Sequence, residues 1–301
     1  MWQELLKDII DGDVRSLARS ISLVENEHPG YEAFMKSLPV DAKAGIIGIT
    51  GPPGAGKSTL VDAIIGALIS RGKKTAVLCV DPSSPFNLGA VLGDRIRMSE
   101  WYTNPNVFIR SLATRGSMGG LSPKIIEITD LVKVAGFDYI IVETVGVGQS
   151  EIEIAGLADT TVVVLVPEAG DEVQTMKSGL MEVADIFVVN KSDRPDADVF
   201  VKNLKQMLAP AFLLKKAEIP VLKTIASQRS GVEELVAAIE KHREMNLTNE
   251  RRKYLLAEKA YFLLRERKMK GISRSMIADK IKHTENFNLY SFIESIHEKS
   301  S

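Results

Sequence analysis

The amino-acid sequence predicts a three-layer α/β domain with a mostly parallel sheet, extended by helices at each end. Between about residues 41 and 245, short apolar runs rich in Val and Ile alternate with stretches of helical periodicity. Continuous apolar strands separated by helices are typical of a parallel sheet that is covered on both faces. The expected strands are the runs 44–50, 75–80, 107–110, 139–143, 160–166, 186–190 and 221–224.

Residues 1–40 show helical periodicity but no strand-like run. Asp13 is placed to cap a helix that begins at Val14. One face of that helix would carry three apolar side chains, Leu17, Ile21 and Val24. We interpret residues 1–40 as a helical arm that packs on the main domain. A partner-binding arm is the alternative.

Residues 246–301 also lack strand-like runs. Asn249 is placed to cap a first helix, and a second helical stretch covers about residues 289–296. The first helix has apolar residues at helical spacing, namely Tyr254, Ala257, Tyr261 and Leu264. Because so short a segment cannot build a rich core alone, we expect it to pack on the main domain or on a second copy of the chain. We interpret it as a C-terminal dimerisation extension.

Composition narrows the classes of function. The chain has 301 residues, a formal net charge of -1 and 45% hydrophobic residues, which predicts a globular protein without a broad basic field for nucleic acid. Its one cysteine, Cys79, excludes an intrachain disulfide, and the four histidines are scattered. No apolar run reaches the length of about 18 residues that a membrane span needs. The N-terminus lacks the apolar core of a signal peptide, so we expect a cytoplasmic protein that binds no membrane.

The segment from Gly51 to Ser58 fits the phosphate-binding pattern G-x-x-x-x-G-K-[ST]. An apolar strand precedes it and a helix-like run follows it, which is the structural context that the pattern requires. Backbone N–H groups of the loop and the helix N-terminus can surround phosphate oxygens, while Lys57 reaches the outer phosphates and the Ser58 hydroxyl binds magnesium. The predicted nucleotide-binding residues are Gly51, Pro52, Pro53, Gly54, Ala55, Gly56, Lys57, Ser58 and Thr59.

The segment Asn190-Lys191-Ser192-Asp193 selects the base. It directly follows an apolar run, so it lies at the carboxyl end of a strand, the edge where ligands bind in open α/β sheets. A carboxylate at Asp193 can accept hydrogen bonds from the guanine ring N–H and the exocyclic amine. Adenine has no such pair of donors. We therefore predict a P-loop GTPase fold that binds GTP and GDP, with Asn190, Lys191 and Asp193 at the base.

Acidic residues follow two further strands of the predicted sheet. Glu143 ends one strand, where its carboxylate can bind magnesium through water or orient the attacking water, and the N–H of Gly146 can reach the terminal phosphate. Asp81 ends another strand at the same edge. The segment 93–97 concentrates charge, so Asp94 is a further magnesium candidate. The predicted magnesium ligands are Ser58, Asp81, Asp94 and Glu143, and the predicted catalytic residues are Lys57, Glu143, Asp94 and Arg97.

The motifs resemble those of the methylmalonyl-CoA mutase-associated GTPases, the MeaB/ArgK family. The distinguishing segments are Gly51–Thr59, Val80–Ser84, Leu92–Met98, Ala113–Gly116, Gly119–Leu121, Glu143–Glu151 and Asn190–Asp193. The resemblance implies a GTP-hydrolysing chaperone that gates cofactor loading of an adenosylcobalamin-dependent acyl-CoA mutase and protects that mutase. It also implies a homodimer, and it makes a cobalamin adenosyltransferase a second candidate partner.

The resemblance further implies switch loops at 81–98, 143–151 and 168–177. The sequence departs from the family at the last guanine loop, which usually contains Ser-Ala; here Thr224 is followed by Ile225, Ala226 and Ser227. Ile225 removes a hydroxyl, so we expect backbone N–H groups of these three residues to meet the guanine carbonyl. The alternatives are a small-molecule or protein kinase linked to transport, and a nickel-insertion GTPase, which would need His or Cys clusters that this chain lacks.

Overall fold

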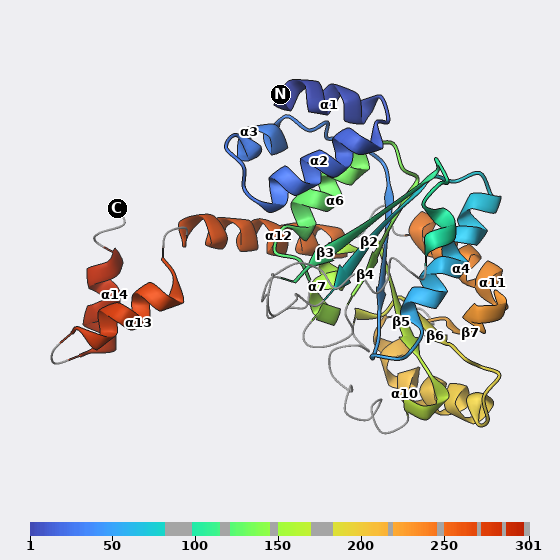
Figure 1. Ribbon diagram of the computed structural model, residues 1–301. Coiled ribbons are helices and arrows are strands. Elements are labelled where there is room, and N and C mark those ends of the chain that lie inside the picture. Colours follow the sequence, from blue (N-terminus) through green and yellow to red (C-terminus); the bar gives the residue numbers. More distant parts are fainter. Residues whose placement is uncertain are drawn as a thin grey trace. The chain divides into compact units, whose positions relative to one another are not determined.

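The computed structural model describes residues 1–81, 98–114, 121–144, 150–169, 183–215, 219–245, 250–269, 272–284 and 287–297. Two compact units divide the chain, Met1–Arg252 and Lys253–Ser301. The first unit contains a seven-stranded parallel sheet in the order β3-β2-β4-β1-β5-β6-β7 (Figure 1). The strands are β1 (Gly45–Thr50), β2 (Thr75–Asp81), β3 (Val107–Ala113), β4 (Tyr139–Glu143), β5 (Thr160–Leu165), β6 (Ile186–Val189) and β7 (Val221–Lys223).

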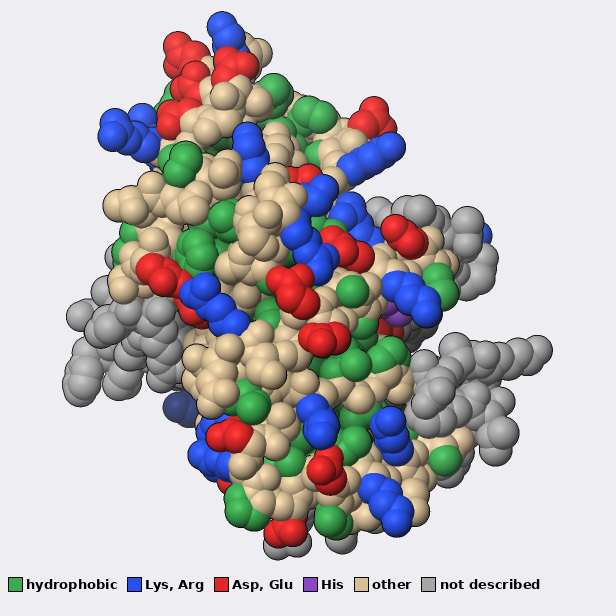
Figure 2. All heavy atoms as spheres, turned by 90° about the vertical axis from the view of Figure 1, so that its right-hand side faces the viewer, with side chains coloured by type: hydrophobic (Ala, Val, Ile, Leu, Met, Phe, Trp, Pro, Cys, Tyr) green, Lys and Arg blue, Asp and Glu red, His purple; other side chains and the backbone are tan. Residues whose placement is uncertain are grey.

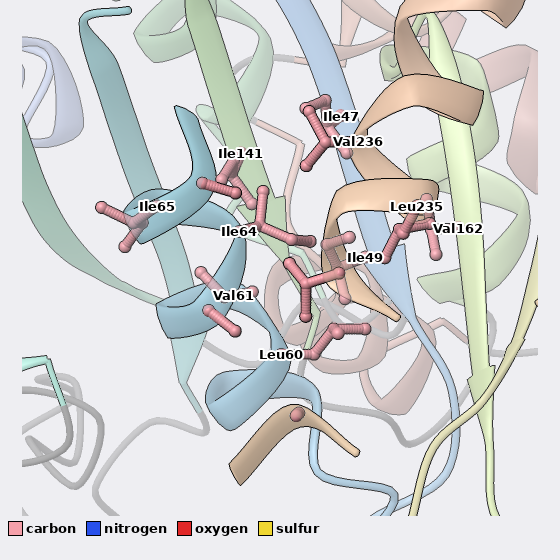
Figure 3. Close-up of a cluster of buried hydrophobic side chains, with 14 of the residues drawn as sticks. Ile47, Ile49, Leu60, Val61, Ile64, Ile65, Ile141, Val162, Leu235 and Val236 are labelled. Carbon is pink, nitrogen blue, oxygen red and sulfur yellow. The ribbon is translucent and has the colours of Figure 1, made fainter. Parts of the chain in front are cut away.

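All seven predicted strands are present, and the predicted three-layer α/β fold is confirmed. Helices α4 (Lys57–Ser70) and α11 (Val232–Met245) cover one face of the sheet. Figure 3 shows Leu60, Ile64 and Leu235 from these helices beside strand residues such as Ile49 and Val162. Buried strands need no polar face, because helices cover both sides of the sheet, and this explains the continuous apolar runs.

Three helices cover the opposite face, α6 (Ile125–Val134), α7 (Ser150–Leu157) and α10 (Ala197–Lys215). Because all seven strands are parallel, their carboxyl ends lie at one edge of the sheet. Among the described residues, that edge carries the segments that follow β1, β5, β6 and β7, which include the predicted phosphate and guanine loops.

The N-terminal residues form α1 (Trp2–Ile10), α2 (Val14–Glu25) and α3 (Tyr31–Lys36). The Asp13 cap is confirmed, because its carboxylate accepts hydrogen bonds from the N–H groups of Arg15 at 3.0 Å and Ser16 at 3.3 Å. The apolar face of α2 is fully buried in the cluster that includes α6. The arm therefore packs on the main domain and is part of its compact unit.

The C-terminal helices are α12 (Glu250–Lys268), α13 (Arg274–Lys282) and α14 (Leu289–His297). Helix α13 was not predicted, although Ser273 caps it by accepting a hydrogen bond from Met276 N at 3.1 Å. Asn249 lies outside the described residues.

Among the helices that are described, none is long and apolar enough to cross a membrane. Figure 2 shows basic and acidic side chains interspersed over the side of the molecule where α4 and α11 lie, as the near-zero net charge predicts.

Candidate nucleotide-binding site

The phosphate loop joins the end of β1 to α4, which begins at Lys57. Gly51, Gly54 and Gly56 have positive φ angles of 139°, 78° and 86°. A Cβ at Gly51 would lie 2.1 Å from the Val164 carbonyl oxygen of β5, and one at Gly56 would lie 2.5 Å from Asn190 Nδ2. The loop thus needs glycine for its backbone conformation. It also needs glycine for its close contact with strand β5 and with the guanine loop, which we define as Asn190–Asp193.

Lys57 lies across this loop, with its side chain buried at 7% exposure. Its Nζ donates hydrogen bonds to the carbonyl oxygens of Gly51 at 2.9 Å and Pro52 at 3.1 Å. The ammonium group therefore lies within the curve of the loop, where phosphate oxygens would meet it. Of the other predicted loop residues, Pro52 and Ala55 are buried, whereas Pro53 and Thr59 are exposed.

Ser58 and Glu143 form a buried pair at the carboxyl edge of the sheet. Ser58 Oγ donates to Glu143 Oε1 at 2.7 Å, and the two residues are 6% and 4% exposed. A hydroxyl and a carboxylate are the hard oxygen donors that Mg²⁺ prefers, and one or two such protein ligands suffice when phosphates supply the rest. The pair therefore fits a magnesium ion. In the described part of the chain, no three His, Cys, Asp or Glu residues group into a further metal site.

The remaining magnesium and catalytic candidates are less fully described. Asp81 is the last residue of β2. Because Cys79 of β2 pairs with Glu143 of β4, Asp81 lies at the same edge as Glu143, but its side chain is outside the described residues. Asp94, Arg97 and Gly146 also lie outside the described residues, so their predicted roles remain predictions.

Asn190 is buried, with 2% of its surface exposed, and its side chain connects three loops. Its Nδ2 donates to the Ala55 carbonyl oxygen at 2.9 Å, and its Oδ1 accepts from Thr224 Oγ1 and from Ala226 N, each at 3.1 Å. Lys191 Nζ donates to the Gly54 carbonyl oxygen at 2.8 Å. The guanine loop is thus bound directly to the phosphate loop, and Asp193 remains exposed beside it.

In the last guanine loop, residues 224–227, two of the three backbone N–H groups that are expected to meet guanine have partners within the protein. The N–H of Ile225 donates to the Ser230 carbonyl oxygen at 3.0 Å, and the N–H of Ala226 donates to Asn190. A short antiparallel bridge uses the N–H of Ile225 and the Asn190 amide uses the N–H of Ala226, and the predicted contacts of these two groups with guanine stay predictions. Ser227 is exposed at the start of the turn and keeps the predicted role.

Two ion pairs next to the guanine loops were not predicted. Arg194 pairs with Glu168 of η2 (Pro167–Ala169), and Arg229 pairs with Glu100 of η1 (Ser99–Trp101). The hydrogen bond from Arg194 lowers the pKa of the exposed Glu168 carboxyl below its usual value. The sequence shows an arginine directly after Asp193, which could have indicated an ion pair at this loop. Its partner, Glu168, lies 26 positions earlier in the chain, so no local pattern identifies it.

A phosphate loop, a buried Ser–Glu pair and an Asn-Lys-x-Asp loop on a parallel sheet define a P-loop GTPase. The family model described as "Methylmalonyl Co-A mutase-associated GTPase MeaB" matches residues 17–281, and the chain belongs to this family. A protein of Pyrococcus abyssi that bears a GTPase name is 45% identical over 293 residues, covering 93% of this chain and 86% of that one.

Further relatives extend the comparison. GTPase ArgK of Escherichia coli is 38% identical over 246 residues, covering 78% of this chain and 74% of its own. The Caenorhabditis elegans protein named "Methylmalonic aciduria type A homolog, mitochondrial" is 41% identical, covering 64% of this chain and 52% of its own. The chain is therefore a GTPase that binds guanine nucleotides.

Two solved structures share the fold. The crystal structure of an LAO/AO transport system kinase has a TM-score of 0.70 at 26% identity and covers 99% of this chain and 96% of its own. The HypB structure from Helicobacter pylori in complex with nickel has a TM-score of 0.52 at 17% identity and covers 76% of this chain and 97% of its own. The second likeness concerns the fold alone.

The buried Ser58–Glu143 pair leads to a prediction about hydrolysis. We expect Glu143→Gln to slow GTP turnover by on the order of a hundredfold and to weaken GTP binding much less, because charge develops around the metal and the attacking water during phosphoryl transfer. Turnover is measured with GTP in excess, and affinity by calorimetry with a non-hydrolysable GTP analogue. The control is Asp185→Asn, which changes a buried carboxylate just before β6, at the opposite edge of the sheet. Equal losses in turnover and affinity would make Glu143 a ligand of the bound nucleotide only.

Proposed function

We propose that this GTPase acts on an adenosylcobalamin-dependent acyl-CoA mutase, with methylmalonyl-CoA mutase as the first candidate. In this role it gates cofactor loading and protects the mutase from inactivation. The observation that carries the proposal is the match to the mutase-associated GTPase family over residues 17–281. The name of the Caenorhabditis elegans relative, which refers to methylmalonic aciduria, supports the same link.

The chemistry of the site gives the proposal a physical cycle. We propose that the Ser58 hydroxyl and the Glu143 carboxylate would hold Mg²⁺, which would supply positive charge to neutralise the phosphates of GTP. Lys57, whose Nζ lies within the loop, would bind the same phosphates. Loss of the γ-phosphate would remove its contacts with Lys57 and with the magnesium site. A mutase that binds the GTP and GDP forms with different affinities is thereby switched by hydrolysis.

The C-terminal unit fits the proposed homodimer. Several large apolar side chains of this unit are exposed, among them Tyr261 at 65%, Leu264 at 59%, Tyr290 at 78% and Ile293 at 52%. Exposed large apolar side chains are candidates for contact with another protein. We propose that a second copy of the chain, or the mutase, covers them. A cobalamin adenosyltransferase is a further candidate partner for the loading step.

The test measures GTP turnover by the purified chain with and without methylmalonyl-CoA mutase. We expect turnover to rise when the mutase is present, because a bound partner can preorganise the charged groups around the phosphates. Adenosylcobalamin transfer to the mutase should also differ between GTP and a non-hydrolysable analogue, since each ligand changes the affinity for the other. Lys57→Ala is the control, because a chain that cannot bind GTP tightly should show neither effect.

Two results would contradict the proposal. If the mutase changes neither turnover nor nucleotide affinity, and transfer does not depend on the nucleotide, the chaperone role is wrong and the GTPase activity stands alone. If labelled phosphate from GTP appears on a metabolite or protein, the chain is a kinase, the activity for which the solved LAO/AO transport system kinase is named.

A further inference from the structure

Asp193 lies between two side chains that fix its loop. On one side, Lys191 has a left-handed backbone conformation with φ 56° and donates to the Gly54 carbonyl oxygen of the phosphate loop. On the other side, the Arg194 guanidinium pairs with the Glu168 carboxylate. Arg194 N also donates to the Lys191 carbonyl oxygen at 3.0 Å, which closes the turn. The loop that carries the exposed Asp193 is therefore held by an inner contact to the phosphate loop and by an outer contact to η2.

The last guanine loop has the same arrangement around Ser227. The inner contact is Ala226 N, which donates to Asn190 Oδ1 at 3.1 Å. The outer contact is Arg229, whose Nη2 lies 2.9 Å from Glu100 Oε1. Arg229 also has a left-handed backbone conformation, with φ 57°, and its N–H donates to the Ala226 carbonyl oxygen at 3.1 Å. Each guanine loop thus ends in an arginine that ties it to a segment outside the loop.

The glutamates that receive these arginines belong to well-anchored segments. In η1, Trp101 Nε1 donates to Asp62 Oδ1 of α4 at 2.7 Å. Met98, which directly precedes η1, is fully buried in the hydrophobic cluster that includes α4. Glu168 lies in η2, which follows the buried strand β5 after a single residue. Because both partners are attached to the sheet or to α4, the ion pairs hold the guanine loops against the rigid part of the domain.

We infer that Arg194 and Arg229 are positioning residues for nucleobase selectivity, which hold Asp193 and Ser227 in the geometry that guanine requires. Neither arginine needs to touch the nucleotide. Without the tethers, the two loops would have to be ordered when the base binds, and this cost would be subtracted from the affinity for GTP. Ligands that carry phosphates but no base would not meet this cost. The inference rests on the GTPase activity alone and is independent of the mutase proposal.

The expected effect of each tether is modest. All four side chains are exposed, between 44% and 57%, and a single exposed ion pair changes an equilibrium by up to about fivefold. The two pairs have no residue in common, so their effects should multiply. Removing both should therefore weaken GTP binding by up to about 25-fold.

The test compares Arg194→Gln, Arg229→Gln and the double variant with the wild-type chain. For each protein, KM and kcat are measured with GTP, and inorganic tripolyphosphate is used as a competitor that carries phosphates without a base. The control is Arg71→Gln, which breaks ion pairs of Arg71 with Glu233 and Glu240 at the end of α4 far from the phosphate loop. Thermal unfolding of every variant is followed in parallel.

We expect KM for GTP to rise in both single variants and to rise further in the double variant, by a larger factor than any fall in kcat. The inhibition constant of tripolyphosphate and the unfolding temperature should match those of the control. Restoring the pair with charges exchanged, Arg194→Glu with Glu168→Arg, should recover part of the GTP affinity. Equal weakening of GTP and tripolyphosphate, a KM for GTP that does not change, or a loss explained by lower thermal stability would overturn the inference.

Discussion

Lys57→Ala is expected to abolish tight GTP binding while the chain remains folded. The Nζ of Lys57 lies within the phosphate loop between the carbonyl oxygens of Gly51 and Pro52. There it can meet two phosphates, so its loss removes charge-assisted contacts worth on the order of 3 kcal/mol, or about a hundredfold in Kd. Calorimetric titration with GDP and GTP measures the change.

The control for this prediction is Lys73→Ala. Lys73 is another lysine of the same domain, but it is exposed at 41%, and its Nζ lies 3.9 Å from the Asp138 carboxylate rather than in the phosphate loop. Its removal should leave nucleotide affinity unchanged. Thermal unfolding of both variants shows whether the loop alone or the whole domain has changed. Unaltered GTP affinity in Lys57→Ala would show that the phosphates bind elsewhere.

Asp193→Asn is expected to reverse the preference of the site from GTP to xanthosine triphosphate. The carboxylate of Asp193 would accept from the guanine ring N–H and its exocyclic amine, and an amide cannot accept both. Xanthine has a carbonyl in place of the amine, to which the new amide can donate. An unpaired polar group in the bound state costs about 1–3 kcal/mol, so GTP should lose roughly ten- to a hundredfold in affinity.

Asp196→Asn is the matched control for this second prediction. Asp196 is exposed in the same segment and has a left-handed backbone with φ 64°, a conformation that asparagine also tolerates. It should change neither GTP nor xanthosine triphosphate binding. A wild-type chain that binds ATP and GTP equally well, or an Asp193→Asn chain that keeps full preference for GTP, would refute the role of Asp193.

The main elements of the fold could be predicted because the sequence signals are local. Seven apolar runs correspond to seven strands, and the glycines of the phosphate loop follow a strand and precede a helix as expected. Glu143 and Ser58 could each be assigned to the site because parallel strands end at one edge. Their direct contact spans 85 positions, and the sequence alone did not predict it.

What the sequence did not predict depends on contacts between distant segments. Glu100 and Arg229 are 129 positions apart, and no local pattern links them. The N–H of Ile225 is hydrogen-bonded within a short antiparallel bridge to Ser230, and the spacing of residues in the sequence does not predict this bridge. Helix α13 is short, and its Ser273 cap is a weak signal when the apolar periodicity around it is poor.

The most direct test of the nucleotide site is hydrolysis of GTP and ATP by the purified full-length chain, with and without Mg²⁺. The Lys57 loop, the Ser58–Glu143 pair and Asp193 together predict that phosphate is released from GTP, that ATP is a poor substrate, and that chelation of Mg²⁺ stops the reaction. Equal hydrolysis of ATP, or release of phosphate from GTP that continues without a divalent cation, would contradict the roles assigned to these residues.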